Sequence, residues 1–224
     1  MTKEIIFVHT FRDGSYEQAY RWTNPDGSEG GTIAKSAILA DGVFVPHDCE
    51  IGPNAMVADG VHIGGLVVIG RRASVGYRVS IGKSTAIGIR ASIDARVSIG
   101  SNARIGNGAS IGSHAHIGDS VVIGNGASIA DDVSIYKDDW LFVAGPQGSR
   151  NAFVTVTYSK NYGLRWWVGC QDGITTDKLR KRIAAEHGEN GHAQEYLHLI
   201  AFVESHPGLE RKKAEIAAKS EALQ

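Results

Sequence analysis

Four arginines and a run of serines in the middle of the chain are spaced so that they could bind one anion together. Arg72 and Arg90 are eighteen residues apart, and so are Arg78 and Arg96. Forked guanidinium groups and hydroxyls are the donors that suit a phosphate group. The expected ligand-binding residues are therefore Arg72, Ser74, Arg78, Arg90, Ser92, Arg96, Ser110 and His114.

The charge balance of this region favours an anionic ligand but does not require one. Between Gly60 and Gly118 the chain has seven Arg or Lys residues and one acid, Asp94. Like charges about 5 Å apart repel by roughly 1–3 kcal/mol before salt screening. A bound anion, Asp94 or a neighbouring subunit could offset this repulsion. The remaining alternative is a solvated surface on which the arginines point away from one another.

A second candidate site is the stretch Pro46-His47-Asp48-Cys49-Glu50-Ile51-Gly52. It resembles the His-Asp-Cys-x-Ile/Val-Gly stretch of hexapeptide acyltransferases that modify UDP-N-acetylglucosamine or act in sialic acid and bacillosamine pathways. The resemblance implies that His47 and Asp48 are catalytic, with His47 deprotonating an acceptor hydroxyl or amine, and that acetyl-CoA or another acyl-CoA is the cofactor. A neutral imidazole oriented by a carboxylate suits this chemistry. Turns also favour His and Asp, so a structural role stays open.

A strict period of six organises the chain from Ile33 to Leu141, because every sixth residue there is Ile, Leu or Val. Glycine usually follows the apolar residue, and Asn-Gly pairs recur at 107–108 and 125–126. A period of six fits neither a helix nor a simple alternating strand, so it predicts a coil of three short strands and three turns. Eighteen such hexads make six coils, whose strands stack roughly 4.8 Å apart.

This repeat resembles the bacterial hexapeptide-repeat family, whose members form left-handed parallel β-helices and usually homotrimers. The expected fold is therefore an all-β left-handed parallel β-helix of six coils with a small C-terminal α+β unit. Stacking places residues eighteen apart in one outward column. The most apolar column contains Val68, Ala86 and Val122, and we expect it to form the subunit interface.

The expected domains are a β cap at 1–32, the β-helix at 33–144, an α+β tail at 145–207 and a helical extension at 208–224. Within the tail, a linker at 145–149 precedes two strands, and Thr176 caps the first of two helices. This ββαα tail resembles uncharacterised bacterial and prophage hexapeptide proteins. Cys170, His187 and His192 could form a thiol–imidazole or zinc site. They fall short of four zinc ligands, which favours a structural role, and no metal site is expected.

The composition narrows the functional classes. A net charge of −1 argues against a nucleic-acid or membrane surface, and no run of eighteen apolar residues occurs. The first residues lack the pattern of a signal peptide, and two cysteines in different regions favour a reducing cytoplasm. Three hypotheses follow. The first is an acyl-CoA-dependent acyltransferase with sites between subunits. The second is a non-catalytic trimer, of a kind that a phage could encode, that captures a phosphorylated small molecule or nucleotide, and the third is a purely structural trimer.

Overall fold

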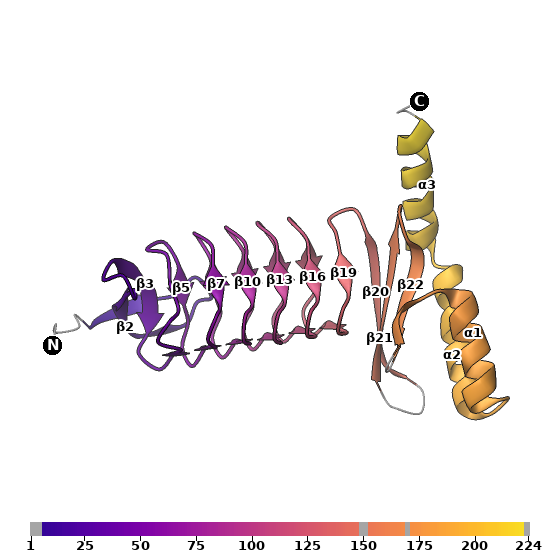
Figure 1. Ribbon diagram of the computed structural model, residues 1–224, viewed down its shortest axis with the longest axis horizontal. Helices are drawn as coiled ribbons and strands as arrows, with labels where there is room; N and C mark the ends of the chain where they lie inside the picture. The colour runs from indigo at the N-terminus through magenta and orange to yellow at the C-terminus, as the bar shows by residue number, and fades with distance from the viewer. Residues whose placement is uncertain (1–5, 148–151, 169–170, 222–224) are drawn as a thin grey trace. The chain divides into compact units, whose positions relative to one another are not determined.

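The computed structural model describes residues 6–147, 152–168 and 171–221. These residues divide into two compact units, Met1–Lys137 and Asp138–Gln224. The first unit is the predicted parallel β-solenoid of about six turns (Figure 1). Two-residue strands alternate with tight turns along it, and they assemble into three sheets that we name faces A, B and C.

Face A begins with the N-terminal cap and continues along the solenoid. Its strands are β1 (Phe7–Thr10), β2 (Tyr16–Thr23), β3 (Glu29–Ala34), β5 (Glu50–Ile51), β8 (Val68–Ile69), β11 (Ala86–Ile87), β14 (Arg104–Ile105) and β17 (Val122–Ile123). The pairs β1–β2 and β2–β3 are antiparallel, whereas β3 pairs with β5 in parallel. The cap therefore covers the edge that the first coil would otherwise leave exposed.

Faces B and C are parallel throughout. Face B contains β4 (Ile38–Leu39), β6 (Met56–Val57), β9 (Ser74–Val75), β12 (Ser92–Ile93), β15 (Ser110–Ile111) and β18 (Ser128–Ile129). Face C contains β7 (His62–Ile63), β10 (Ser80–Ile81), β13 (Ser98–Ile99), β16 (His116–Ile117) and β19 (Ser134–Ile135).

The stacking register confirms the predicted columns of residues eighteen apart. Ile87 pairs with Ile69 on one side and Ile105 on the other, and the outward residue Ala86 pairs with Val68 and Arg104. The apolar residues of the hexads point inward, and Ile69, Ile87 and Ile105 are all buried. Burial of these columns is the main driving force for the solenoid, because each strand is too short to be stable alone.

The turns of the solenoid contain two special positions: one with a positive φ, and one where glycine follows the buried apolar residue. Every sixth residue from Asn54 to Asp132 has a positive φ, between 55° and 69°. The glycines that follow the buried residues do not have this conformation. Most of them are required because the next coil passes close by: a Cβ on Gly82 would lie 2.4 Å from the carbonyl carbon of Gly100. Absence of a Cβ at these glycines therefore permits the close approach between coils.

Side chains in the turns tie each coil to the next. Asp119 Oδ1 accepts the N–H of Ser101 at 2.6 Å, and Asp131 Oδ1 accepts the N–H of Ser113 at 2.7 Å. Asn107 and Asn125 make the same bond to the residue eighteen positions earlier, both at 2.8 Å. We call this arrangement the turn ladder. It satisfies backbone donors that the short strands leave unpaired.

The loop between β1 and β2 completes the turn ladder near the cap. Asp13 Oδ2 accepts the N–H of Arg71 at 2.7 Å, fifty-eight residues away. The position eighteen residues after Arg71 is Ile89, which has no side-chain acceptor. Partial burial raises the pKa of Asp13, but hydrogen bonds from Ser15 and Arg71 outweigh it and lower the pKa overall. Asp13 therefore anchors the cap to the solenoid as a carboxylate.

The second unit is a four-stranded antiparallel sheet with three helices, which confirms the predicted α+β class. Its elements are β20 (Trp140–Gln147), β21 (Ala152–Ser159), β22 (Gly163–Val168), β23 (Gln171–Ile174), α1 (Thr176–His187), α2 (Gly191–Glu204) and α3 (Pro207–Glu221). Trp166, Ile200 and Val203 are central to its core. As expected, Leu179 and Ile183 are the buried residues of the first helix.

Several boundaries differ from the expected ones. Leu141, the last apolar residue of the repeat, lies in β20 opposite Thr157, so it belongs to the antiparallel sheet. Residues 145–147 of the expected linker continue β20, and 148–149 lie outside the described residues. Thr175 caps α1 in place of Thr176, because its side chain accepts the N–H of Lys178. Turn residues alone could not show that the strands would extend so far.

The role of Asp13 can be tested against a matched turn in the same cap. Asp26 makes the same local bonds to Ser28 that Asp13 makes to Ser15, but only Asp13 has the distant bond to Arg71. We expect Asp13→Ala to lower the free energy of unfolding by about 1 kcal/mol more than Asp26→Ala, the usual net contribution of one hydrogen bond. Urea unfolding followed by circular dichroism measures both. Equal losses would show that the distant bond contributes nothing.

Candidate functional site

The imidazole of His47 has a carboxylate partner, but it is not the expected one. His47 Nε2 lies 3.3 Å from Oε1 of Glu29, the first residue of β3. Arg21 on β2 contacts both residues: its Nε is 3.9 Å from the same Glu29 oxygen, and its Nη1 donates to the backbone carbonyl of His47 at 3.2 Å. His47 and Glu29 are both well exposed, at 64% and 62% of their side chains. An acceptor molecule can therefore reach the imidazole.

Asp48, the expected partner of His47, is directed into the next coil instead. A hydrogen bond from the backbone N–H of Leu66 lowers the pKa of the Asp48 carboxyl. Leu66 is one of the turn residues with positive φ, at 60°. Asp48 therefore supports the stacking of the first coils, and its proximity to His47 in sequence does not create a dyad. Its expected catalytic role remains a prediction without a supporting contact.

The contacts of Cys49 are those of a structural residue. Its side chain is buried and its thiol donates to the carbonyl of Gly64 at 3.2 Å. Burial raises the pKa of the Cys49 thiol to about 11, so the thiol is protonated and a poor nucleophile at neutral pH. Thr85, thirty-six residues later in the same inward column, makes the equivalent bond to Gly100 at 2.8 Å. The cysteine thus fills a position where a hydroxyl also fits.

The four arginines of the other candidate site occupy turn positions on the two edges of face B. Arg72, Arg78, Arg90 and Arg96 all have positive φ, from 55° to 60°, and all are exposed. Their backbone N–H groups donate to the preceding coil, as Arg90 does to Arg71 at 2.9 Å and Arg96 does to Tyr77 at 2.8 Å. Ser74, Ser92 and Ser110 lie between the two edges as half-buried strand residues. The expected arrangement of two arginine edges beside a serine strip is present.

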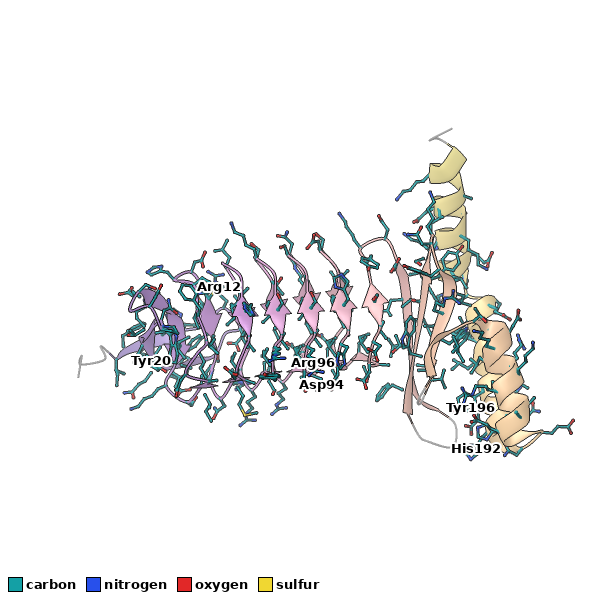
Figure 2. The ribbon with its side chains drawn as sticks, viewed as in Figure 1. Arg12, Tyr20, Asp94, Arg96, His192 and Tyr196 are labelled. Atoms are coloured by element: carbon teal, nitrogen blue, oxygen red, sulfur yellow. The ribbon has the colours of Figure 1, made fainter. Side chains whose placement is uncertain are left out.

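Two of these arginines contact aromatic side chains, and none of them contacts a described acid. Arg96 Nη1 is 3.3 Å from Nε2 of His114, eighteen residues later, and Arg78 lies 4.7 Å above the ring of Tyr77. Within the described part of the chain, none of the four arginines forms an ion pair. Asp94, labelled beside Arg96 in Figure 2, does not neutralise one of them, although the sequence made this possible. Among the described residues, no acid lies within ion-pair distance of these four guanidinium groups.

A groove of about 610 Å³ on face A was not anticipated from the sequence. Its floor is the column expected to form the subunit interface, Val68, Ala86 and Val122, and one end is bounded by Arg12 and Asp13 of the cap. Arg104 interrupts this apolar column and is exposed. The column itself was visible in the sequence, but the groove required the cap loop to fold onto it.

The histidines of the second unit do not form a recognisable metal site. The rings of His187 and His192 are 6.0 Å apart, and His187 stacks on Tyr196 at 5.8 Å. Cys170, the third residue of the possible site, lies outside the described residues. Among the residues that are described, no three His, Cys, Asp or Glu side chains are placed to share a metal ion. Likewise, no described helix is both long and apolar enough to cross a membrane.

Comparison with known proteins finds similarity in solved structures alone. No family model matches the chain, and no curated protein matches it. The acetyltransferase domain of PglB from Neisseria gonorrhoeae, in complex with acetyl coenzyme A, is 21% identical, with 47% of this chain and 51% of that chain covered and a TM-score of 0.28. The present chain therefore spans about half of that protein's length.

Two further solved structures show the same kind of likeness. A hexapeptide transferase family protein from Anaplasma phagocytophilum is 17% identical over 46% of this chain and 75% of its own, with a TM-score of 0.37. The UDP-N-acetylglucosamine acyltransferase of Francisella novicida is 16% identical over 75% of this chain and 88% of its own, with a TM-score of 0.28. At these identities the likeness concerns the repeat fold and not the activity.

The contact of Asp48 with Leu66 predicts acid sensitivity of the solenoid. Because the folded pKa of Asp48 is lowered, its stabilising contribution is present above its unfolded pKa, about 4, and is lost as the pH falls through the folded value. Asp48→Asn keeps an acceptor for Leu66 but cannot titrate, so its melting temperature should fall less than that of the wild type between pH 5 and pH 2. Asp41→Asn is the control, because Asp41 accepts no side-chain hydrogen bond in the described ranges. Identical acid profiles for Asp48→Asn and wild type would contradict this account.

Proposed function

We propose that the protein is an acyl-CoA-dependent acyltransferase that transfers an acyl group to a hydroxyl or amine of a small molecule. The observation that carries this proposal is the exposed His47 imidazole against Glu29, with Arg21 beside the Glu29 carboxylate and bonded to the backbone carbonyl of His47. A carboxylate against one ring nitrogen is the arrangement by which a histidine acts as a general base. The His-Asp-Cys-x-Ile-Gly resemblance of this stretch to hexapeptide acyltransferases supports the same role.

The proposal gives distinct roles to the two ring nitrogens of His47. Nε2 faces Glu29, so Nδ1 is the nitrogen that would take the proton of the acceptor O–H or N–H. The acceptor atom attacks the thioester carbonyl carbon, the C–S bond breaks, and the imidazolium returns the proton to the departing thiolate. Glu29 stabilises the imidazolium while it carries the positive charge. In this proposal Glu29 takes the orienting role that the sequence suggested for Asp48.

The proposal includes a homotrimer with acyl-CoA bound in the clefts between subunits, as the family resemblance implies. The chain does contain an exposed apolar column, Val68, Ala86 and Val122, that a neighbouring subunit could cover. Arg104 lies in the same column, and no described acid pairs with it. A subunit packed on this column would therefore have to supply an acid, because an unpaired buried charge is strongly destabilising. The trimer proposal does not depend on which faces meet.

A second function is favoured by the uncompensated arginines: capture of a phosphate-bearing small molecule, such as a nucleotide, on face B. Arginine is a poor choice for a turn with positive φ, where Gly and Asn are the favoured residues. The chain uses Gly60 and Asn102 at equivalent turns, yet places arginine at four of them. Leu66, Ser84 and Ser120 occupy equivalent turns as well, so the backbone does not select arginine and the argument for a ligand rests on the chemistry of the guanidinium groups. Guanidinium forks bind phosphate bidentately and can also stack on a base.

Kinetics of His47 variants test the acyltransferase proposal. We expect His47→Ala to lower turnover at least about a hundredfold, because it removes the general base, with little change in stability. Glu29→Gln should lower turnover less, since it keeps the His47 base and removes only the carboxylate charge beside it. Thiol release from acetyl-CoA, with amino sugars and nucleotide-linked sugars as acceptors, measures both. His62→Ala, at an exposed histidine of the next coil, is the control. Activity unchanged in His47→Ala would exclude His47 from the reaction.

Substitution of the arginines by asparagine tests the second function without straining the turns. Arg90→Asn and Arg96→Asn should each weaken nucleotide binding by about 1.5–3 kcal/mol, the contribution of a charge-assisted contact. Each should also raise the melting temperature of the unliganded protein, because repulsion is relieved and Asn tolerates positive φ. Ser84→Asn, at a turn on another edge with φ of 59°, is the control. Titration calorimetry with ATP measures binding, and thermal melts measure stability. A lower melting temperature of the arginine variants, with no effect of anions on the melting of the wild type, would indicate a purely structural role.

A further inference from the structure

The groove on face A combines an apolar floor with one edge made of hydrogen-bond donors. The floor follows the strands from β8 to β17, and the edge is the turn that contains Asn107 and Asn125. Four adjacent strands span roughly 14 Å. The volume of about 610 Å³ lies within the range of small-molecule sites. None of the residues that line the groove belongs to the His47 pair or to the arginines of face B.

The turn ladder fixes which end of each asparagine amide is available. Asn107 Oδ1 accepts the N–H of Ile89, and Asn125 Oδ1 accepts the N–H of Asn107, both at 2.8 Å. Each oxygen is therefore occupied by the backbone of the preceding coil. The amide NH₂ groups form no hydrogen bond with any described residue, so donors are what these two side chains offer to a ligand.

Arg104 adds a cation to the groove that no described acid pairs with. It is exposed between Ala86 and Val122, and it has no ion pair with any residue in the described ranges. The other charged groups are already engaged: Arg12 Nε lies 3.5 Å from Glu50 Oε1, and Asp13 accepts bonds from Ser15 and Arg71. Arg104 therefore places a positive charge beside the asparagine edge, whereas the Asp13 carboxylate lies at the end of the groove that the cap bounds.

We propose that this groove binds a small amphipathic monoanion, with its anionic head at Arg104, Asn107 and Asn125 and its apolar body on Val68, Ala86 and Val122. A guanidinium and two amide NH₂ groups are donors only, which selects a carboxylate or a phosphate ester over a neutral or cationic head. The apolar floor excludes a fully hydrated anion as the preferred ligand. A second copy of the chain is the competing occupant, but it would bury the unpaired Arg104.

Titration calorimetry with three ligands of one chain length tests the proposal: octanoate, octanol and octylamine. Octanoate should bind at least about tenfold more tightly than octanol, and octylamine should not bind saturably. Arg104→Gln should weaken octanoate at least about tenfold and leave octanol unchanged, whereas Lys83→Gln, at an exposed cation outside the groove, should change neither.

Asn107→Asp gives the sharpest comparison, because the chain itself shows that the fold tolerates it. Asp119 and Asp131 make the same ladder bond with a carboxylate. The variant should therefore keep its melting temperature but lose octanoate binding, since an anion replaces a donor at the edge. Equal affinity for octanoate and octanol, unchanged binding in Arg104→Gln, or no binding of octanoate would each overturn the proposal. So would a fall in mass by light scattering for Val122→Glu, which would show that another copy covers the groove.

Discussion

The stacking of one eighteen-residue coil on the next is the constraint on which the rest of the solenoid depends. It places Ile69, Ile87 and Ile105 in one buried column, and it requires glycine where successive coils approach most closely. It also forces a positive φ on every sixth residue from Asn54 to Asp132. Side chains at the turns are then free to vary, provided that the backbone donors of each coil find acceptors in its neighbours. Chemistry on this scaffold is therefore carried by turn residues and by outward strand residues.

The same constraint explains why the sequence predicted the fold so well. The period of six can be read from the positions of Ile, Val and Gly in the sequence. Residues eighteen apart then stack whatever the handedness of the coil. The register of Arg96 above His114 followed from that arithmetic and is confirmed by their 3.3 Å contact. The end of the repeat was harder to predict, because Leu141 keeps the period while its backbone pairs with an antiparallel strand. Periodicity alone does not distinguish these two pairings.

The candidate sites were less predictable, since their decisive contacts join the solenoid to the cap. Glu29 lies at the start of β3, before the repeat begins at Ile33, so the period of six gives no position for its side chain beside His47. Asp48 is adjacent to His47 in sequence but is directed toward Leu66 by the coil above it. The groove on face A likewise exists because Asp13 draws the β1–β2 loop onto the solenoid. A sequence signal was available for the turn ladder, in the Asn and Asp residues eighteen apart, but its effect on amide orientation appears in the structure alone.

Binding of acyl-CoA is the central functional claim, and a thermal melt of the full chain with acetyl-CoA tests it most directly. A ligand that binds the folded state at a hundred times its Kd adds about 2.7 kcal/mol to the free energy of unfolding. For a chain of this length we therefore expect the melting temperature to rise by several degrees as acetyl-CoA approaches about 1 mM. The rise should be smaller with ATP at the same concentration. An unchanged melting temperature with acetyl-CoA, together with a rise with ATP, would contradict the acyltransferase account.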